Sequence, residues 1–236
     1  MKKASGSLFV ARLALSTALV AIATMMLNIY VPATHGYFNL GETMIYFTAL
    51  LMGPGAAAFA GGVGSAIADL ALGYSIYAPA TLLIKAAEGA VAGLLSEKIR
   101  ERGGRMLLAL SIIVVAGYFL LVLAIGLNLF AGEVELSLGT FLTTKGFLGP
   151  AAWILIAVAA AAAPVYLTLR FRESEGLLIL GLLTSGLIMV AGYFIYEQLI
   201  LGYYALAEVP VNLGQVVLGV AAAVPLYGAV KKLSTR

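Results

Sequence analysis

Four ionisable side chains lie inside an otherwise apolar stretch of this chain, residues 39–93. They are Glu42, Asp69, Lys85 and Glu88. A charge near the centre of a bilayer costs about 2.5–3.5 kcal/mol even on mild insertion scales, so such groups need a compensating role. Three carboxylates and an ammonium group can bind a polar solute or can neutralise one another. We interpret the stretch as one wall of a polar pocket for a small molecule.

Further polar and aromatic residues are expected at a similar depth. Thr81 and Lys85 are four residues apart, so they share one face of a helix. Amides that form paired hydrogen bonds, tyrosines that stack and charges that orient a solute together suit a flat polar ring compound. Tyr193 is expected at the same depth. The predicted substrate-binding residues are Asn39, Glu42, Asp69, Tyr74, Tyr77, Thr81, Lys85, Tyr196, Glu197, Asn212 and Gln215.

Each of these residues also has a purely structural interpretation, which the sequence leaves open. Lys85 can form a buried neutral pair with Asp69 or Glu88 instead of contacting a solute. The remaining structural roles are helix capping by Glu42 and Asn212 and anchoring at the membrane interface by Tyr74 and Tyr77.

The residue types present exclude most enzyme chemistry. The chain has no cysteine and one histidine, His35, which excludes thiolate metal sites, cysteine nucleophiles and histidine metal clusters. Ser65 could act as a nucleophile only with His35, which lies in an expected outer loop. The glycine-rich GGVGS at 61–65 lacks the Gly-Lys-Ser/Thr ending of a phosphate loop. We predict that the protein is not an enzyme and uses no metal or other cofactor.

The composition is that of a helical membrane protein. Of the 236 residues, 62% are hydrophobic and 11% are charged, and the mean hydropathy is +1.05. A soluble domain could not bury so much apolar surface, whereas a membrane bundle exposes it to lipid. The first apolar run exceeds the roughly 7–15 residues of a signal-peptide core. We predict an all-α integral membrane protein with about eight helices, at 8–31, 42–52, 56–72, 80–95, 106–130, 147–169, 177–201 and 213–230.

Basic residues mark one side of this bundle. With eight helices, twelve of the fourteen lysines and arginines fall on one side, Lys145 falls on the other, and Lys85 lies within a helix. Lysine and arginine are enriched in the cytoplasmic loops of membrane proteins. We therefore predict a multi-pass protein of the plasma membrane with both termini in the cytoplasm, and no nucleic-acid partner.

The chain repeats itself at an offset of 75 residues. VAGYF at 115–119 recurs at 190–194, and the Glu-Val pair at 133–134 recurs at 208–209. These matches in one register indicate a duplicated helix pair. The costly polar groups, such as Glu197, belong to the second copy, so we expect the first copy to be peripheral.

Small residues recur on the first helix. Ala14 and Ala18 are four apart, a spacing that lets two helices approach closely in lipid, and Ala11 continues the same face. The spacing by itself favours internal packing over docking to another protein and leaves both open.

The central motifs resemble a known family. They are NLGE with the ALLMGPG turn, then GGVGSAIADLALGYSIYAP with TLLIKAAEG, and finally GYFIYE with PVNLGQ. They are similar to the S components, the substrate-binding membrane subunits, of energy-coupling factor (ECF) vitamin transporters, in the riboflavin and hydroxymethylpyrimidine/pyridoxine-like branch. The resemblance covers about 8–95 and 177–232. The pair at 106–170 departs from the family pattern and reads as an insertion in a single membrane domain.

The resemblance implies a six-helix core that captures a vitamin from outside the cell. It also implies a transmembrane coupling protein and two ATPase subunits as partners, with Ala11, Ala14 and Ala18 as the face that docks the coupling protein. The family's substrate contacts fall in places that are occupied here by Asn39, Glu42, Tyr74, Tyr77, Lys85, Glu197, Asn212 and Gln215.

We therefore predict the substrate-capture subunit of an ATP-driven importer for a vitamin or its precursor, such as riboflavin, pyridoxine or hydroxymethylpyrimidine. The sequence does not identify the vitamin. The alternative is a stand-alone secondary transporter in which Asp69, Lys85 and Glu88 relay protons or sodium ions.

Overall fold

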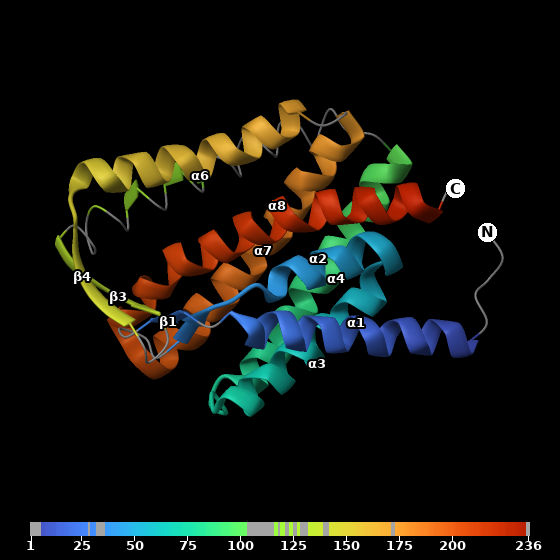
Figure 1. Ribbon diagram of the computed structural model, residues 1–236, viewed down its shortest axis with the longest axis horizontal. Coiled ribbons are helices and arrows are strands. Elements are labelled where there is room, and N and C mark those ends of the chain that lie inside the picture. Colours follow the sequence, from blue (N-terminus) through green and yellow to red (C-terminus); the bar gives the residue numbers. More distant parts are fainter. Residues whose placement is uncertain are drawn as a thin grey trace.

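The computed structural model describes residues 6–27, 29–31, 36–102, 116, 117, 119, 120, 123, 124, 127, 132–138, 142–170 and 173–234. In this part of the chain, long helices form a bundle with two small antiparallel hairpins at one end (Figure 1). Five described helices are long and apolar enough to cross a membrane. They are α1 (Gly6–Met26), α3 (Pro54–Leu72), α4 (Ala78–Arg102), α7 (Glu173–Leu201) and α8 (Glu208–Ser234). The predicted class, an all-α integral membrane protein, is confirmed.

The other described elements are shorter or flank these spans. Helix α2 covers Gly41–Met52, α6 covers Pro150–Arg170, and the 3-10 helix η1 covers Gly202–Ala207. The hairpins pair β1 (Ile29–Val31) with β2 (Gly36–Phe38) and β3 (Gly132–Leu138) with β4 (Leu142–Leu148). Most of the predicted helix 106–130 lies outside the described residues, so the predicted total of eight helices stays a prediction.

The first hairpin corrects the sequence-based boundaries at the N-terminal span. The apolar run was expected to be helical as far as Val31, but α1 ends at Met26. Ile29–Val31 pairs instead with Gly36–Phe38, a segment expected to be loop, with Ile29 opposite Phe38. Isoleucine, tyrosine and valine favour strands because their branched or aromatic side chains fit a pleated surface. Tyr37 of β2 thereby lies within hydrogen-bond distance of Asp69 in α3.

The second hairpin limits the duplication. The Glu-Val pair at 133–134 lies in strand β3, whereas its counterpart at 208–209 begins helix α8. The register sets Glu135 opposite Lys145, in a stretch expected to be loop. Glu208 instead occupies the first turn of a helix, where a carboxylate interacts favourably with the helix dipole. The two copies therefore share sequence but not secondary structure at this point.

Helix boundaries also move at the charged ends of the spans. Helix α4 continues to Arg102, beyond the expected end at 95, because the charged segment 97–102 is rich in good helix formers. Helix α8 begins five residues earlier than the expected Leu213. The earlier start places Asn212 inside the helix, so its interpretation as an N-cap is wrong.

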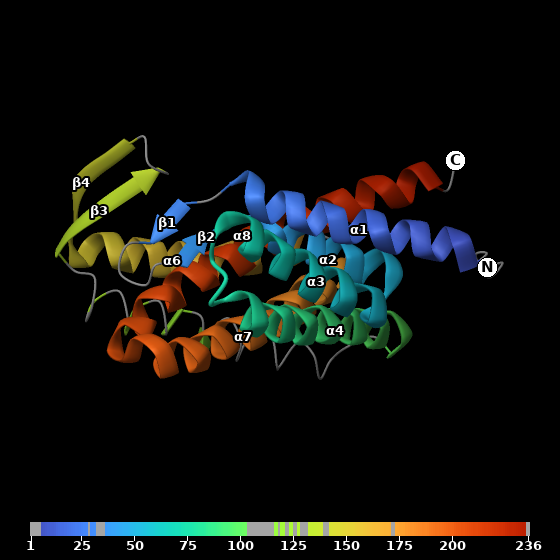
Figure 2. The same cartoon turned by 90° about the horizontal axis from the view of Figure 1, so that it is seen from below.

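Helices α3 and α4 pack side by side through glycine (Figure 2). A Cβ atom added at Gly89 of α4 would lie 2.4 Å from the backbone oxygen of Ala57 in α3. One added at Gly62 of α3 would lie 2.6 Å from the backbone oxygen of Leu82 in α4. Backbones this close leave no room for a side chain between them. The contact fixes α3 against α4 and so sets Asp69 relative to Lys85.

The two ends of the bundle differ in character. Both chain termini lie at one end and the hairpins at the other (Figure 1). At the terminal end, Arg100 Nη2 donates a hydrogen bond of 2.8 Å to the Leu50 carbonyl at the end of α2. The Arg100 guanidinium also lies 5.1 Å from the ring centroid of Tyr227 in α8. One cation therefore ties α4 to α2 and α8 at this end.

We expect Gly89→Ala to destabilise the protein by about 1–3 kcal/mol, because the new methyl group would overlap the α3 backbone. The measurement is thermal unfolding of the purified protein in detergent. Gly228→Ala in α8 is the matched control: nothing lies within 4 Å of its new Cβ atom, and alanine is the better helix former. Equal melting temperatures for the two variants would contradict the glycine-packing interpretation.

Candidate functional site

A polar cavity lies towards the hairpin end of the bundle, among five helices and strand β2. The space open to the centres of water molecules is about 40 Å³, which is room for roughly three waters. Its walls come from segments far apart in the sequence: α1, the β2–α2 region, the α3–α4 pair, α7 and α8. The lining residues are Thr24, Tyr37, Asn39, Ser65, Asp69, Tyr77, Thr81, Lys85, Tyr193, Glu197, Glu208 and Gln215.

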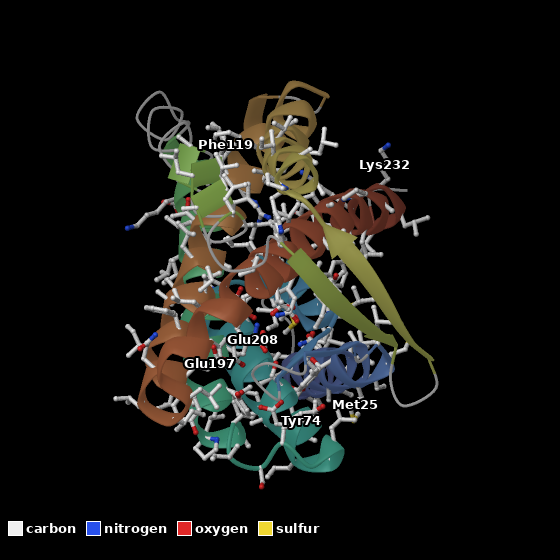
Figure 3. The ribbon with its side chains drawn as sticks, turned by 90° about the vertical axis from the view of Figure 1, so that its left-hand side faces the viewer. Met25, Tyr74, Phe119, Glu197, Glu208 and Lys232 are labelled. Atoms are coloured by element: carbon white, nitrogen blue, oxygen red, sulfur yellow. The ribbon has the colours of Figure 1, made fainter. Side chains whose placement is uncertain are left out.

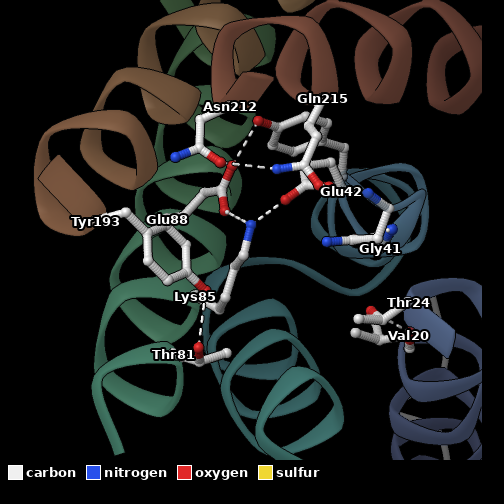
Figure 4. A network of polar contacts seen from close by, with 12 residues as sticks. Val20, Thr24, Gly41, Glu42, Thr81, Lys85, Glu88, Tyr193, Asn212 and Gln215 are labelled. Carbon is white, nitrogen blue, oxygen red and sulfur yellow. Dashed lines mark hydrogen bonds and ion pairs between the residues drawn. The ribbon is translucent and has the colours of Figure 1, made fainter. Parts of the chain in front are cut away.

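Lys85 forms the centre of a buried ion network (Figure 4). Its Nζ atom donates to Glu42 of α2 and, at 3.3 Å, to Glu88 Oε2 one turn along α4. The Tyr46 hydroxyl donates to Glu88 Oε1 at 2.6 Å. Lys85, Glu42 and Glu88 are each at most 3% exposed. The structure therefore contains the expected contact with Glu88, adds Glu42, and gives Asp69 a different partner.

Asp69 bonds to a tyrosine delivered by the first hairpin. Tyr37 OH donates to Asp69 Oδ1 at 2.7 Å, and the Tyr37 ring packs on Tyr74 with 4.5 Å between ring centroids. Burial raises the pKa of the Tyr37 phenol, and the neighbouring Asp69 carboxyl raises it further. Tyr37 therefore stays neutral and acts as a hydrogen-bond donor. Strand β2 is bonded in this way to α3 beside the cavity.

Two amides join the start of α2 to α8. The backbone N–H of Asn39 donates to Gln215 Oε1 at 2.7 Å, and Gln215 Nε2 donates to Asn212 Oδ1 at 2.9 Å. The Asn39 side chain accepts a bond of 2.9 Å from the Gly41 N–H at the start of α2. Gln215 lines the cavity, while Asn212 holds it from behind. The predicted amides Asn212 and Gln215 are therefore in contact, and Asn212 orients Gln215.

Tyr77 and Tyr193 line the side of the cavity nearest α7, and Tyr196 packs against Tyr77. Tyr193 OH and Thr81 Oγ1 share a hydrogen bond of 2.9 Å between α7 and α4. Tyr77 meets the Tyr196 ring edge-on at 5.9 Å between centroids, and Tyr196 OH donates to the Ile76 carbonyl. Burial raises the pKa of Tyr77, and the carboxyl of Glu197 adds to the increase. The ring of Tyr77 faces the cavity as a neutral surface.

Some buried oxygen atoms at the cavity are left without partners. Asp69 Oδ2, Glu197 Oε2 and Ser65 Oγ have no hydrogen-bond partner among the described residues, and each residue is at most 4% exposed. Glu42 Oε2, behind the wall, is in the same condition. A buried polar atom without a partner costs about 1–3 kcal/mol, and more when charged. A bound solute or water can remove that cost.

The structure brings most of the predicted site residues together. Glu42 and Asn212 lie behind the lining, while Tyr74 and Tyr196 pack against the lining residues Tyr37 and Tyr77. Those that line the cavity are Asn39, Asp69, Tyr77, Thr81, Lys85, Glu197 and Gln215. Their role in binding stays a prediction.

Sequence reasoning missed four lining residues, one of which, Ser65, was considered only as a nucleophile. Tyr37 was missed because its strand was taken as loop, and Thr24 because a lone threonine in a span gives no signal. Glu208 was recognised only as part of the repeat. It lies close to Glu197 near the middle of the bundle in Figure 3, viewed from the hairpin end. A carboxylate at the start of a span was the signal that could have identified it.

Two comparisons relate the chain to known proteins. The profile of a family described as the ECF-type riboflavin transporter, S component, matches residues 8–142. A Pyrococcus woesei protein named "Uncharacterized protein in gap 3'region" is 45% identical over 102 residues, which are 42% of this chain and 68% of that protein. The profile match covers the walls from α1 to α4 and extends into the segment taken as an insertion. The resemblance of 177–232 continues to rest on its own motifs.

We expect Lys85→Met to destabilise the ligand-free protein by about 3–5 kcal/mol, because Glu42 and Glu88 would keep their burial and lose their cation. Thermal unfolding in detergent measures the effect. Adding Glu42→Gln to Lys85→Met should restore part of the loss, since one uncompensated carboxylate disappears. A single variant as stable as the wild type, or a double variant less stable than the single, would contradict the network.

Proposed function

This chain belongs to the ECF-type riboflavin transporter S component family, and from that premise we propose that its cavity captures one vitamin or vitamin precursor for import. The protein is a multi-pass membrane subunit of a transporter and is not an enzyme. Riboflavin, pyridoxine and hydroxymethylpyrimidine are the proposed types of solute. All three are small rings with polar substituents, as the tyrosines and hydrogen-bonding groups of the cavity require.

The observation that carries the proposal is the set of buried oxygens, without described hydrogen-bond partners, that belong to residues lining one cavity. Asp69 and Glu197 line the cavity from α3 and α7, so a solute bound to both would contact two different helices. Tyrosine rings line the remaining sides, where they can pack on a planar solute. A purely structural polar core would be expected to satisfy its own hydrogen bonds.

Entry of a solute requires the cavity to enlarge. About 40 Å³ of space for water centres accommodates a few waters but no vitamin-sized ring. The β1–β2 hairpin is the segment that can change this volume, because Tyr37 reaches the cavity from β2 and is tied to it mainly by one bond to Asp69 and one ring contact. We propose that this hairpin opens for entry and closes over the bound solute.

The charge distribution supports an orientation with both termini in the cytoplasm. Five described basic residues lie in the parts of α1, α4 and α8 that are nearest the end of the bundle with both chain termini. They are Arg12, Lys98, Arg100, Lys231 and Lys232. The cavity lies towards the opposite end, which the positive-inside rule would place outside. Bound solute would then be released on the cytoplasmic side when two ATPase subunits act through a transmembrane coupling protein.

Mass spectrometry of compounds that co-purify with the detergent-solubilised chain tests the capture function. We expect one vitamin-like ring compound in near-stoichiometric amount, because the enclosed, multi-walled cavity should release it slowly. Cells that also express the coupling protein and ATPases should accumulate this compound, whereas cells with this chain alone should only bind it. Accumulation driven by an ion gradient without ATPases would favour the secondary-transporter alternative. A protein that carries no small molecule would contradict capture.

The alanine face of α1 provides a test of the proposed partner. Ala11, Ala14 and Ala18 are all exposed, so no described helix packs over them. We expect Ala14→Trp to abolish co-purification with the coupling protein, since the indole would prevent close helix approach, and to leave solute binding unchanged. Leu83→Trp on α4, at a residue 71% exposed, is the control and should retain the complex. An Ala14→Trp variant that still assembles would exclude this face.

A further inference from the structure

The residues that line the cavity include more acidic than basic side chains. Asp69, Glu197 and Glu208 face it from three different helices, and among the twelve lining residues Lys85 is the one cation. That cation is bonded to Glu42 and to Glu88. Its ion pairs are with carboxylates of α2 and α4, and it forms no described ion pair with Asp69 or Glu197. Each of these two is at most 4% exposed, so bulk water does not solvate them.

The hydrogen bonds at the cavity also show an excess of acceptors over donors. Tyr37 donates its hydroxyl to Asp69 Oδ1, which leaves Oδ2 without a described donor. The Thr81 hydroxyl interacts with Asp69 and shares a hydrogen bond with Tyr193, in which either oxygen can be the donor. Glu197 Oε2 also has no donor among the described residues. The groups left over on the two walls are mainly acceptors, so a matching solute must supply N–H or O–H donors.

The aromatic lining suits positive charge as well. The face of a tyrosine ring carries partial negative charge and attracts cations within about 6 Å of its centroid. Lys85 already uses the Tyr193 ring in this way, with its Nζ 5.6 Å from the centroid (Figure 4). Tyr37 and Tyr77 add two further rings to the lining. A cation in the cavity would contact ring faces and carboxylates together.

We propose that the solute is an organic cation: a planar ring bearing an ammonium or other protonated nitrogen whose donors pair with Asp69 and Glu197 on opposite walls. This inference rests on the proposed capture function and narrows its substrate class. A neutral ring of the same shape would leave the two carboxylates without a counter-charge. A carboxylated or phosphorylated ring would add like charge to the site, and such repulsion costs several kcal/mol at desolvated sites.

Matched ligands separate charge from shape. Pyridoxamine and pyridoxine share one ring, but the first carries an aminomethyl group, an ammonium at neutral pH, where the second carries a hydroxymethyl group. Thiamine, with its permanent positive charge, and riboflavin, which is neutral, form a second pair. Isothermal titration calorimetry on the full chain in nanodiscs, stripped of co-purified solute, gives the four dissociation constants. We expect at least one cation to bind ten-fold or more tightly than its neutral counterpart.

Two variants locate the preference within the cavity. Asp69→Asn and Glu197→Gln keep the size of the side chain and remove its charge, so each should reduce the neutral-to-cation ratio of dissociation constants by ten-fold or more. Glu97→Gln, on the exposed terminal-side end of α4, is the matched control and should leave the ratio unchanged. Size-exclusion profiles and melting temperatures in detergent verify that each variant is folded before titration.

The outcomes distinguish this inference from the function on which it rests. If neither cation binds more tightly than its neutral counterpart, the cation proposal is overturned while capture of a vitamin stands. An unchanged ratio in both Asp69→Asn and Glu197→Gln also overturns it, because the preference would then arise elsewhere. If none of the four compounds binds, the result counts against both proposals.

Discussion

The burial of Lys85 is the constraint on which the site depends. An ammonium group in a low-dielectric interior is tolerated only when carboxylates and hydrogen bonds compensate its lost hydration. Glu42, from α2, and Glu88, from α4, provide this compensation, and Tyr46 in turn fixes Glu88. Helix α2 must therefore stay against α4 at one register. This wall of the cavity resists rearrangement because moving either helix would leave a buried charge without its partner.

Close helix packing makes this arrangement possible. Gly62 and Gly89 let the backbones of α3 and α4 touch, and a Cβ atom added at Gly219 would lie 2.5 Å from Glu42 Cβ, so α8 approaches α2 equally closely. Helices held at such short range place side chains from different elements within hydrogen-bond distance. The polar network and the small residues therefore depend on each other. The glycines let the helices approach closely enough for the charged groups to pair, and these pairs fix the helices relative to one another.

The two walls of the cavity have different sequence origins. The wall from α1 to α4 lies within the region that matches the transporter family, and it contains the neutralised lysine network. The wall from α7 and α8 lies outside that match and contributes Glu197, Glu208 and Gln215. Each wall contributes a lining carboxylate with one oxygen that has no described hydrogen-bond partner, Asp69 from the first and Glu197 from the second. The proposed solute preference thus depends on both walls.

The sequence by itself determined the membrane class, the family and most of the polar residues of the cavity. These follow from local composition and motif, since an ionisable group in an apolar span is costly wherever the helices pack. Only the tertiary structure decided which groups meet. It paired Lys85 with Glu42, bonded Asp69 to Tyr37, set Asn212 behind Gln215, and paired 29–31 with 36–38 as antiparallel strands. Partner choice depends on helix register and rotation across separations as large as 176 residues, which local patterns do not encode. This choice of partner determines whether a buried charged group is paired within the protein or remains available to a solute.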